Sequence, residues 1–169
     1  EWGADAPFVR PANISTDHSI IVEVIRHAID WCEKKSWNIL NICCIYPTAP
    51  FLLSSDIISG LKLLNEPNTQ YSFSATSYAF PIQRAFYMNK SDQVEMFYPE
   101  HLNTRSQDLK DAYHDAGQFY WGKVEAFKEE LPLFANHSRP ILLPRTRVQD
   151  IDTLEDWDNA EKKYRALSY

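Results

Sequence analysis

The stretch ILNICCIY, residues 39–46, is a nearly continuous apolar run of strand length that ends at Pro47. A strand that is apolar on both faces is typical of the centre of a parallel sheet, where helices cover both sides. Residues 17–35 predict an amphipathic helix before it, because apolar side chains recur there at i, i+3, i+4, i+7 and i+8. Three residues can cap this helix: Ser15, Thr16 and Asp17. The two elements together indicate an α/β fold.

Helices and strands continue to alternate along the chain. We predict a helix over 54–64, capped by Ser54 or Ser55, and then a strand over 71–78. A hairpin follows, formed by 85–88 and 94–98. The remaining predicted elements are a short strand over 118–121, a helix over 123–130, a strand over 140–143 and a helix that begins with the capping box Thr153-Leu-Glu-Asp156. The alternation favours a doubly wound, mostly parallel Rossmann-like sheet, in which ligands bind beyond the carboxyl ends of strands. The hairpin and the polar segment after it interrupt this pattern. We therefore predict one domain over 1–169, with an insertion at about 79–112.

Composition and charge exclude several classes of protein. The chain has 169 residues, which suits one domain. Its net charge of 17 − 23 = −6 argues against broad electrostatic contact with a nucleic acid polymer or an anionic membrane. No window holds the roughly 20 apolar residues of a membrane span, and the first residues lack the features of a signal peptide. The cysteines, Cys32, Cys43 and Cys44, are odd in number and predict free buried thiols, which favours a reducing compartment such as the cytoplasm.

Two aspartates make a candidate metal site. The glycine-rich motifs of dinucleotide-binding and P-loop proteins are absent, so phosphate chemistry would need other residues. If residues 149–153 are extended, Asp150 and Asp152 point to the same face about 6.6 Å apart. Mg²⁺ held by one or two carboxylates can bridge to phosphate oxygens. Alternatively, the two acidic side chains stabilise the N-terminus of the following helix.

Other polar and aromatic side chains each allow two interpretations. Four arginines are either anion partners or solvated charges: Arg10, Arg105, Arg145 and Arg147. His114 beside Asp115 is either an acid–base pair or part of a polar loop. Five aromatic residues could stack on a sugar or pack in the core: Tyr98, Tyr113, Phe119, Tyr120 and Trp121.

Six longer stretches follow one another along nearly the whole chain. They are RP at 10–11, IYPTAPF at 45–51, FPIQRA at 80–85, FYPEHLNTRSQDL at 97–109, YHDAGQFYWG at 113–122 and RVQDIDTLEDW at 147–157. Together they resemble the sialic acid cytidylyltransferases, most closely the pseudaminic acid branch. The resemblance implies that the anomeric hydroxyl of a nine-carbon α-keto acid sugar attacks the α-phosphate of CTP, giving a CMP-sugar and pyrophosphate. Mg²⁺ is the cofactor that the family implies.

The resemblance also implies roles for particular residues. Asp150 and Asp152 match the metal-binding, catalytic aspartates of the family. Arg105 and Gln107 fall on an insertion that forms a homodimer and reaches the sugar pocket of the partner subunit. Tyr46 stands where sialate enzymes have a glutamine, which favours pseudaminate over N-acetylneuraminate. The remaining implied contacts are nucleotide for Arg10, and sugar for Tyr46, Thr48, Ala49, Gln83, His114, Asp115, Gln118, Phe119 and Tyr120.

One block of the family pattern is absent from the sequence. Family members open with a basic, glycine-containing loop that holds the phosphates of CTP, and nothing similar precedes Arg10. We therefore expect a C-terminal portion that lacks about 60 residues and does not turn over CTP alone. Two alternatives stay open: an enzyme that activates N-acetylneuraminate or legionaminate, and a noncatalytic, dimeric sugar-binding fragment.

Overall fold

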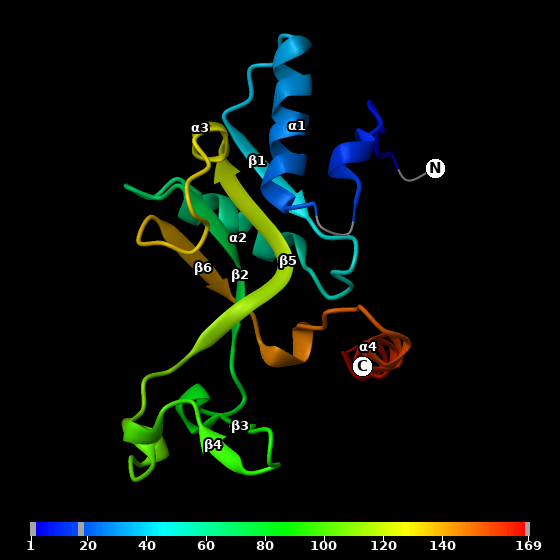
Figure 1. Cartoon of the computed structure of the whole chain (residues 1–169). Helices are drawn as coiled ribbons and strands as arrows, with labels where there is room; N and C mark the ends of the chain where they lie inside the picture. The colour runs from blue at the N-terminus through cyan, green and yellow to red at the C-terminus, as the bar shows by residue number, and fades with distance from the viewer. Residues whose placement is uncertain (1–2, 17–18, 168–169) are drawn as a thin grey trace.

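A four-stranded sheet forms the centre of the computed structural model, which describes residues 3–16 and 19–167 (Figure 1). The strands lie in the order β1 (Asn41–Ile45), β5 (Tyr113–Lys123), β2 (Tyr71–Ser77) and β6 (Ser138–Leu142). β5 runs antiparallel to both β1 and β2, whereas β2 runs parallel to β6. The fold is α/β, as predicted, and its sheet is mixed.

Three of the four described strands, β1, β2 and β6, run in the same direction, and β5 runs against them. β1 lies at an edge of the described sheet, and its residues are half-buried or exposed rather than central. An apolar run indicates cover on two faces but carries no information about the direction of the neighbouring strands. The antiparallel neighbour is β5, of which we predicted only residues 118–121. His114, Asp115 and Gly117 interrupt the apolar pattern in the first half of that strand.

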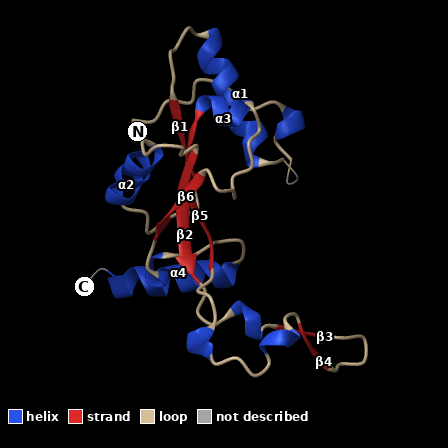
Figure 2. Cartoon of the chain, turned by 90° about the vertical axis from the view of Figure 1, so that its left-hand side faces the viewer, coloured by secondary structure: helices blue, strands red, loops and turns tan. Residues whose placement is uncertain are grey.

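Helices cover both faces of the sheet (Figure 2). On one face, α1 (Ile21–Lys34) and α3 (Val124–Lys128) bury a cluster that includes Ile29 and Phe127 with Tyr71 of β2. On the other face, α2 (Ser54–Leu64) packs so closely that a Cβ on Gly60 would lie 2.7 Å from the ring of Phe119. The last helix, α4 (Leu154–Leu167), lies beyond the end of β6. The finer prediction of a doubly wound sheet stays a prediction.

Two predicted helix caps are wrong. Ile20 occupies the cap position of α1, while the Ser15 hydroxyl donates to the carbonyl of Pro11 at 2.8 Å and the Thr16 N–H donates to Ser19. The third candidate, Asp17, lies outside the described residues. Leu53 rather than a serine precedes α2, and its N–H donates to the Asp56 carboxylate at 3.1 Å.

The predicted hairpin is present, as β3 (Phe86–Met88) and β4 (Val94–Met96), and it projects beyond the end of the sheet (Figure 1). Short 3-10 helices occupy Ala12–Ile14, Ile82–Arg84, Pro99–His101, Ser106–Asp108 and Arg145–Arg147. Within 3–16 and 19–167, no helix combines the length and apolarity that crossing a bilayer requires. The cysteines are free, as predicted, although half-buried rather than fully buried.

Candidate functional site

A large irregularity in β5 creates the candidate site. β2 and β5 pair at Phe73 and Tyr120 and next at Ala75 and Asp115, so β5 places residues 116–119 opposite Ser74 alone. Gly117 adopts a φ of 60°, which glycine tolerates without strain. The extra residues bend β5 away from a straight path (Figure 1).

The Ser74 hydroxyl holds this bulge from the neighbouring strand. Its Oγ accepts the backbone N–H groups of Gln118 and Phe119 at 3.1 and 3.2 Å, and the serine is fully buried. These two N–H groups have left the regular pairing of the strands, so they need another acceptor. Ser74 supplies it.

A cavity of about 490 Å³ opens beside the bulge. It lies where β1 ends, where β5 bends and where the chain continues beyond β6. Its lining residues are Tyr46, His114, Asp115, Ala116, Gly117, Tyr120, Val148, Gln149 and Asp150. Two of the three segments follow the carboxyl ends of strands, which is where an α/β sheet was expected to place its ligand site.

Asp115 organises the wall of this cavity. Its carboxylate accepts the Gly117 N–H at 2.9 Å and the hydroxyl of Tyr120. Burial, and then the contact with Asp115, raise the pKa of Tyr120, so its hydroxyl stays protonated and donates. Burial also raises the pKa of Tyr46, whose ring lies 5.4 Å from the ring of Tyr120. The wall therefore presents neutral phenols beside a carboxylate.

Neither interpretation of His114 beside Asp115 holds: the two residues belong to β5 rather than a loop, and their side chains do not form an acid–base pair. The Nδ1 of His114 hydrogen-bonds to the backbone carbonyl of Asp115 at 2.8 Å, and its ring packs on Tyr78. The carboxylate of Asp115 is directed to Tyr120 and Gly117 instead. Neighbouring residues on a strand point to opposite faces, which separates the two side chains.

The structure separates the two candidate metal ligands. Asp150 lines the cavity, and one of its carboxylate oxygens accepts the N–H of Ile151 at 3.1 Å. Asp152 does not line it, and its N–H donates to Asp156 at 3.3 Å. Both residues are exposed. The N-terminus of α4 is capped by Thr153 and Asp156 rather than by either of these carboxylates.

The carboxylates on the cavity lining are those of Asp115 and Asp150. No three His, Cys, Asp or Glu side chains of the described chain converge as a ready-made metal cage. Mg²⁺ is typically held by one or two carboxylates, with water and substrate phosphates completing its shell. Asp150 offers such a hard oxygen ligand at the edge of the cavity, with the Asp115 carboxylate also on its lining.

Gln118 and Phe119 do not line the cavity, and both side chains are buried. Phe119 is 0% exposed and packs beneath α2, because it occurs on the opposite face of β5 from Tyr120. Gln118 is 1% exposed, and its amide donates to the carbonyl of Arg147 at 2.7 Å. Of the aromatic residues proposed as a stacking wall, only Tyr120 lines this cavity.

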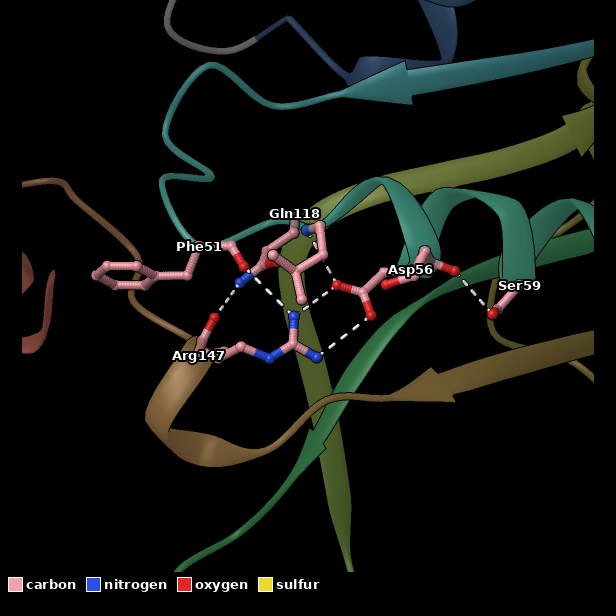
Figure 3. A network of polar contacts seen from close by, with 7 residues as sticks. Phe51, Asp56, Ser59, Gln118 and Arg147 are labelled. Carbon is pink, nitrogen blue, oxygen red and sulfur yellow. Dashed lines mark hydrogen bonds and ion pairs between the residues drawn. The ribbon is translucent and has the colours of Figure 1, made fainter. Parts of the chain in front are cut away.

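Arg147 is not a free anion partner. Its guanidinium pairs with Asp56 through two hydrogen bonds, at 2.6 and 3.2 Å (Figure 3). Arg105 is exposed and pairs in a similar way with Asp108. Arg10 donates to Ser15. Of these arginines, none lines the cavity.

Several other predicted residues lie apart from the cavity. Thr48 and Ala49 are half-buried in the loop after β1 and are not among its lining residues. Gln83 and Gln107 belong to the insertion, where the Gln83 amide donates to the carbonyl of Lys110 at 3.1 Å. Neither residue is among those that line the cavity.

Comparison with curated proteins decides the family, although no family model matches the chain. The chain is 42% identical over 166 residues to a pseudaminic acid cytidylyltransferase of Campylobacter jejuni serotype O:2, covering 98% of the chain and 71% of that protein. A pseudaminic acid cytidylyltransferase of serotype O:23/36 is 40% identical with the same coverage. The chain belongs to the pseudaminic acid cytidylyltransferase family. A Helicobacter pylori protein, named a pseudaminic acid cytidylyltransferase and UDP-2,4-diacetamido-2,4,6-trideoxy-β-L-altropyranose hydrolase, is 35% identical over 151 residues, 28% of its length.

Sequence reasoning missed part of the site in this member of the cytidylyltransferase family. Ala116, Gly117, Val148 and Gln149 line the cavity without having been singled out. One local signal was available: Asp115-Ala-Gly117 is a typical Asx turn, in which the carboxylate accepts the N–H two residues later. Ser74 carried no signal, because its role depends on a strand that is distant in sequence.

Proposed function

We propose that this chain takes part in the transfer of the cytidylyl group of CTP to pseudaminic acid, which releases pyrophosphate. The observation that carries the proposal is 42% identity over 98% of the chain to a protein named for that activity. In the reaction, the anomeric oxygen of the sugar forms a bond to the α-phosphorus, and the bond from that phosphorus to the pyrophosphate oxygen breaks. The three free thiols support a reducing, cytoplasmic setting.

The residues of the cavity divide into two proposed groups. Asp150, with Asp152 beside it in sequence, would hold Mg²⁺, whose positive charge offsets the charge that develops on the phosphates. Tyr46 and Tyr120 would orient the sugar through their hydroxyls, which burial keeps protonated. Asp115 would hold the Tyr120 hydroxyl in place by accepting a hydrogen bond from it. The contribution of this chain is thus positioning and electrostatic stabilisation, the main sources of catalysis in phosphoryl transfer.

Formation of CMP-pseudaminic acid tests the proposal. The 169-residue chain, and a chimera that joins it to the part of the Campylobacter jejuni serotype O:2 relative that it does not match, are each incubated with CTP, Mg²⁺ and pseudaminic acid. Mass spectrometry should detect the CMP-sugar in the chimera reaction. N-acetylneuraminic acid, in a parallel reaction, should give far less product. Absence of product from both preparations, while the relative is active under the same conditions, would contradict the proposal.

We also propose that the hairpin insertion forms a twofold dimer contact. Met88 and Val94 are opposite each other on β3 and β4, and both are more than half exposed, at 59% and 62%. Phe80, Phe86, Phe97 and Leu102 add further exposed apolar surface to the insertion. An apolar patch of this kind on a small projection is typical of an interface. In a dimer, Arg105 and Gln107 would approach the cavity of the partner subunit.

Light scattering tests the dimer contact. We expect a dimer at micromolar concentration, and we expect Met88→Glu/Val94→Glu to give a monomer, because two like charges would face their own symmetry copies. Leu154→Glu is the control, since it adds a charge at an exposed apolar residue of α4, outside the insertion. An unsubstituted chain that stays monomeric, or a hairpin variant that stays dimeric, would refute the proposed contact.

A further inference from the structure

Arg147 joins segments that are distant in sequence (Figure 3). Its Nη1 donates to Asp56 Oδ2 at 2.6 Å and its Nη2 to Asp56 Oδ1 at 3.2 Å. Nη1 also lies 3.4 Å from the carbonyl oxygen of Phe51, in the loop that follows β1. The two charged side chains are 19% and 11% exposed, so solvent screens this pair less than a surface ion pair.

The backbone that follows Arg147 is held from two other elements. The amide of Gln118, in the bulge of β5, donates to the carbonyl of Arg147 at 2.7 Å. The ammonium of Lys163, on α4, donates to the carbonyl of Val148 at 2.7 Å and to Gln149 Oε1 at 2.8 Å. Residues 147–149 are therefore fixed by α2, β5 and α4 together.

Asp150 is the first residue after this fixed segment. Gln149 and Asp150 line the cavity, so the placement of 147–149 determines where the Asp150 carboxylate reaches the cavity. The bidentate geometry requires the planar guanidinium of arginine, because a lysine ammonium cannot donate two parallel hydrogen bonds to one carboxylate.

We propose that Arg147 is a positioning residue, which sets the location of Asp150 at the cavity through its clamp on Asp56. We call the paired hydrogen bonds between Arg147 and Asp56 the clamp. The effect of the clamp on catalysis rests on the proposed function, whereas its effect on the backbone does not. Arg145 is the matched control. It lies in the same 3-10 turn, is exposed, and its side chain has no hydrogen bond or ion pair within the described residues.

Nitrogen-15 relaxation of the 169-residue chain tests the clamp. The backbone order parameters of residues 148–151 should be near 0.85, roughly the value of a rigid backbone, in the unsubstituted chain. Arg147→Met should lower them below about 0.6 while those of α2 and β2 stay unchanged. Arg147→Lys should give intermediate values, since it keeps the charge but not the second hydrogen bond. Arg145→Met should change nothing.

A second variant covers the case in which Arg147→Met does not fold, since it leaves Asp56 without its counter-charge. In Arg147→Met/Asp56→Asn both charges are removed, and the asparagine oxygen can still accept the Leu53 N–H that begins α2. Loss of order confined to 148–151 in either variant supports the proposal. Unchanged order there, equal loss across α2 and β2, or values already below about 0.6 in the unsubstituted chain would overturn it.

Mg²⁺ dependence links the clamp to Asp150. In the chimera, the Mg²⁺ concentration for half-maximal turnover should rise about tenfold in Arg147→Met, as is typical when an outer partner of a metal ligand is removed. Arg145→Met should leave it unchanged. If local order is lost but the Mg²⁺ dependence is not altered, the positioning role is refuted. If the unsubstituted chimera forms no product, the proposed function fails, and the order parameters still decide the clamp.

Discussion

Asp150→Asn is expected to lower the turnover of the chimera about a hundredfold or more. Asparagine has nearly the shape of aspartate but lacks its charge, so it is a weaker ligand for Mg²⁺. Metal ions contribute several kcal/mol to the stabilisation of charge in a transition state, and each ~1.4 kcal/mol corresponds to a tenfold change in rate. Since Asp150 is exposed, the variant should fold normally. The rate of pyrophosphate release, measured against Mg²⁺ concentration, checks both the size and the origin of the loss.

Variants of two nearby aspartates, Asp152 and Asp158, test whether the loss of turnover is specific to Asp150. Asp152→Asn should also reduce the rate, but less than Asp150→Asn, because Asp152 does not line the cavity. Asp158→Asn is the control, as it removes the same charge from an exposed residue of α4. Equal rates for Asp150→Asn and the unsubstituted chimera would refute the metal role of Asp150. A similar loss in Asp158→Asn would attribute the effect to overall charge.

Features that depend on neighbouring residues could be predicted from the sequence. The capping box of α4 is an example: the Asp156 N–H donates to the Thr153 hydroxyl at 3.2 Å, and the Thr153 N–H donates to the Asp156 carboxylate at 3.0 Å. Four residues within one turn contain all the information that this motif needs. The hairpin of β3 and β4 was predicted for the same reason.

Features that depend on distant pairing could not be predicted in this way. The direction of β5 relative to β1 and β2 is set by which strands meet, and the apolar periodicity of each strand does not encode it. The pairing of Asp56 with Arg147, 91 residues apart, has no local signature either. The sequence singled out Arg147 as either an anion partner or a solvated charge, and it gave no reason to pair this residue with Asp56.

In the candidate site, too, local features could be predicted from the sequence and long-range arrangement could not. The two-residue spacing of Asp150 and Asp152 identified the segment, but it could not reveal that only Asp150 lines the cavity. That difference arises because the backbone turns towards the N-terminus of α4, where the Asp152 N–H meets the carboxylate of Asp156. Likewise, Phe119 and Tyr120 are adjacent in sequence, yet only Tyr120 faces the cavity.

Ser74→Ala should destabilise the chain by about 2–6 kcal/mol, because it removes the acceptor of two buried N–H groups. Each buried donor left without a partner costs about 1–3 kcal/mol. The donors belong to Gln118 and Phe119, inside the protein and away from solvent. For a domain of this size, each kcal/mol lowers Tm by about 2–4 °C, so the loss corresponds to a fall in Tm of about 4–24 °C. Urea unfolding measures the change in the free energy of unfolding directly.

Ser72→Ala provides a control on the same strand and the same face. Ser72 is also fully buried, but its hydroxyl has no hydrogen-bond partner among residues 3–16 and 19–167. Its removal leaves no donor unsatisfied, so Ser72→Ala should be nearly neutral or slightly stabilising. If both alanine variants lose the same stability, the effect comes from lost packing and Ser74 has no special role. A large difference between them would mean that one hydroxyl of β2 maintains the bend of β5 on which the Asp115 and Tyr120 wall of the cavity depends.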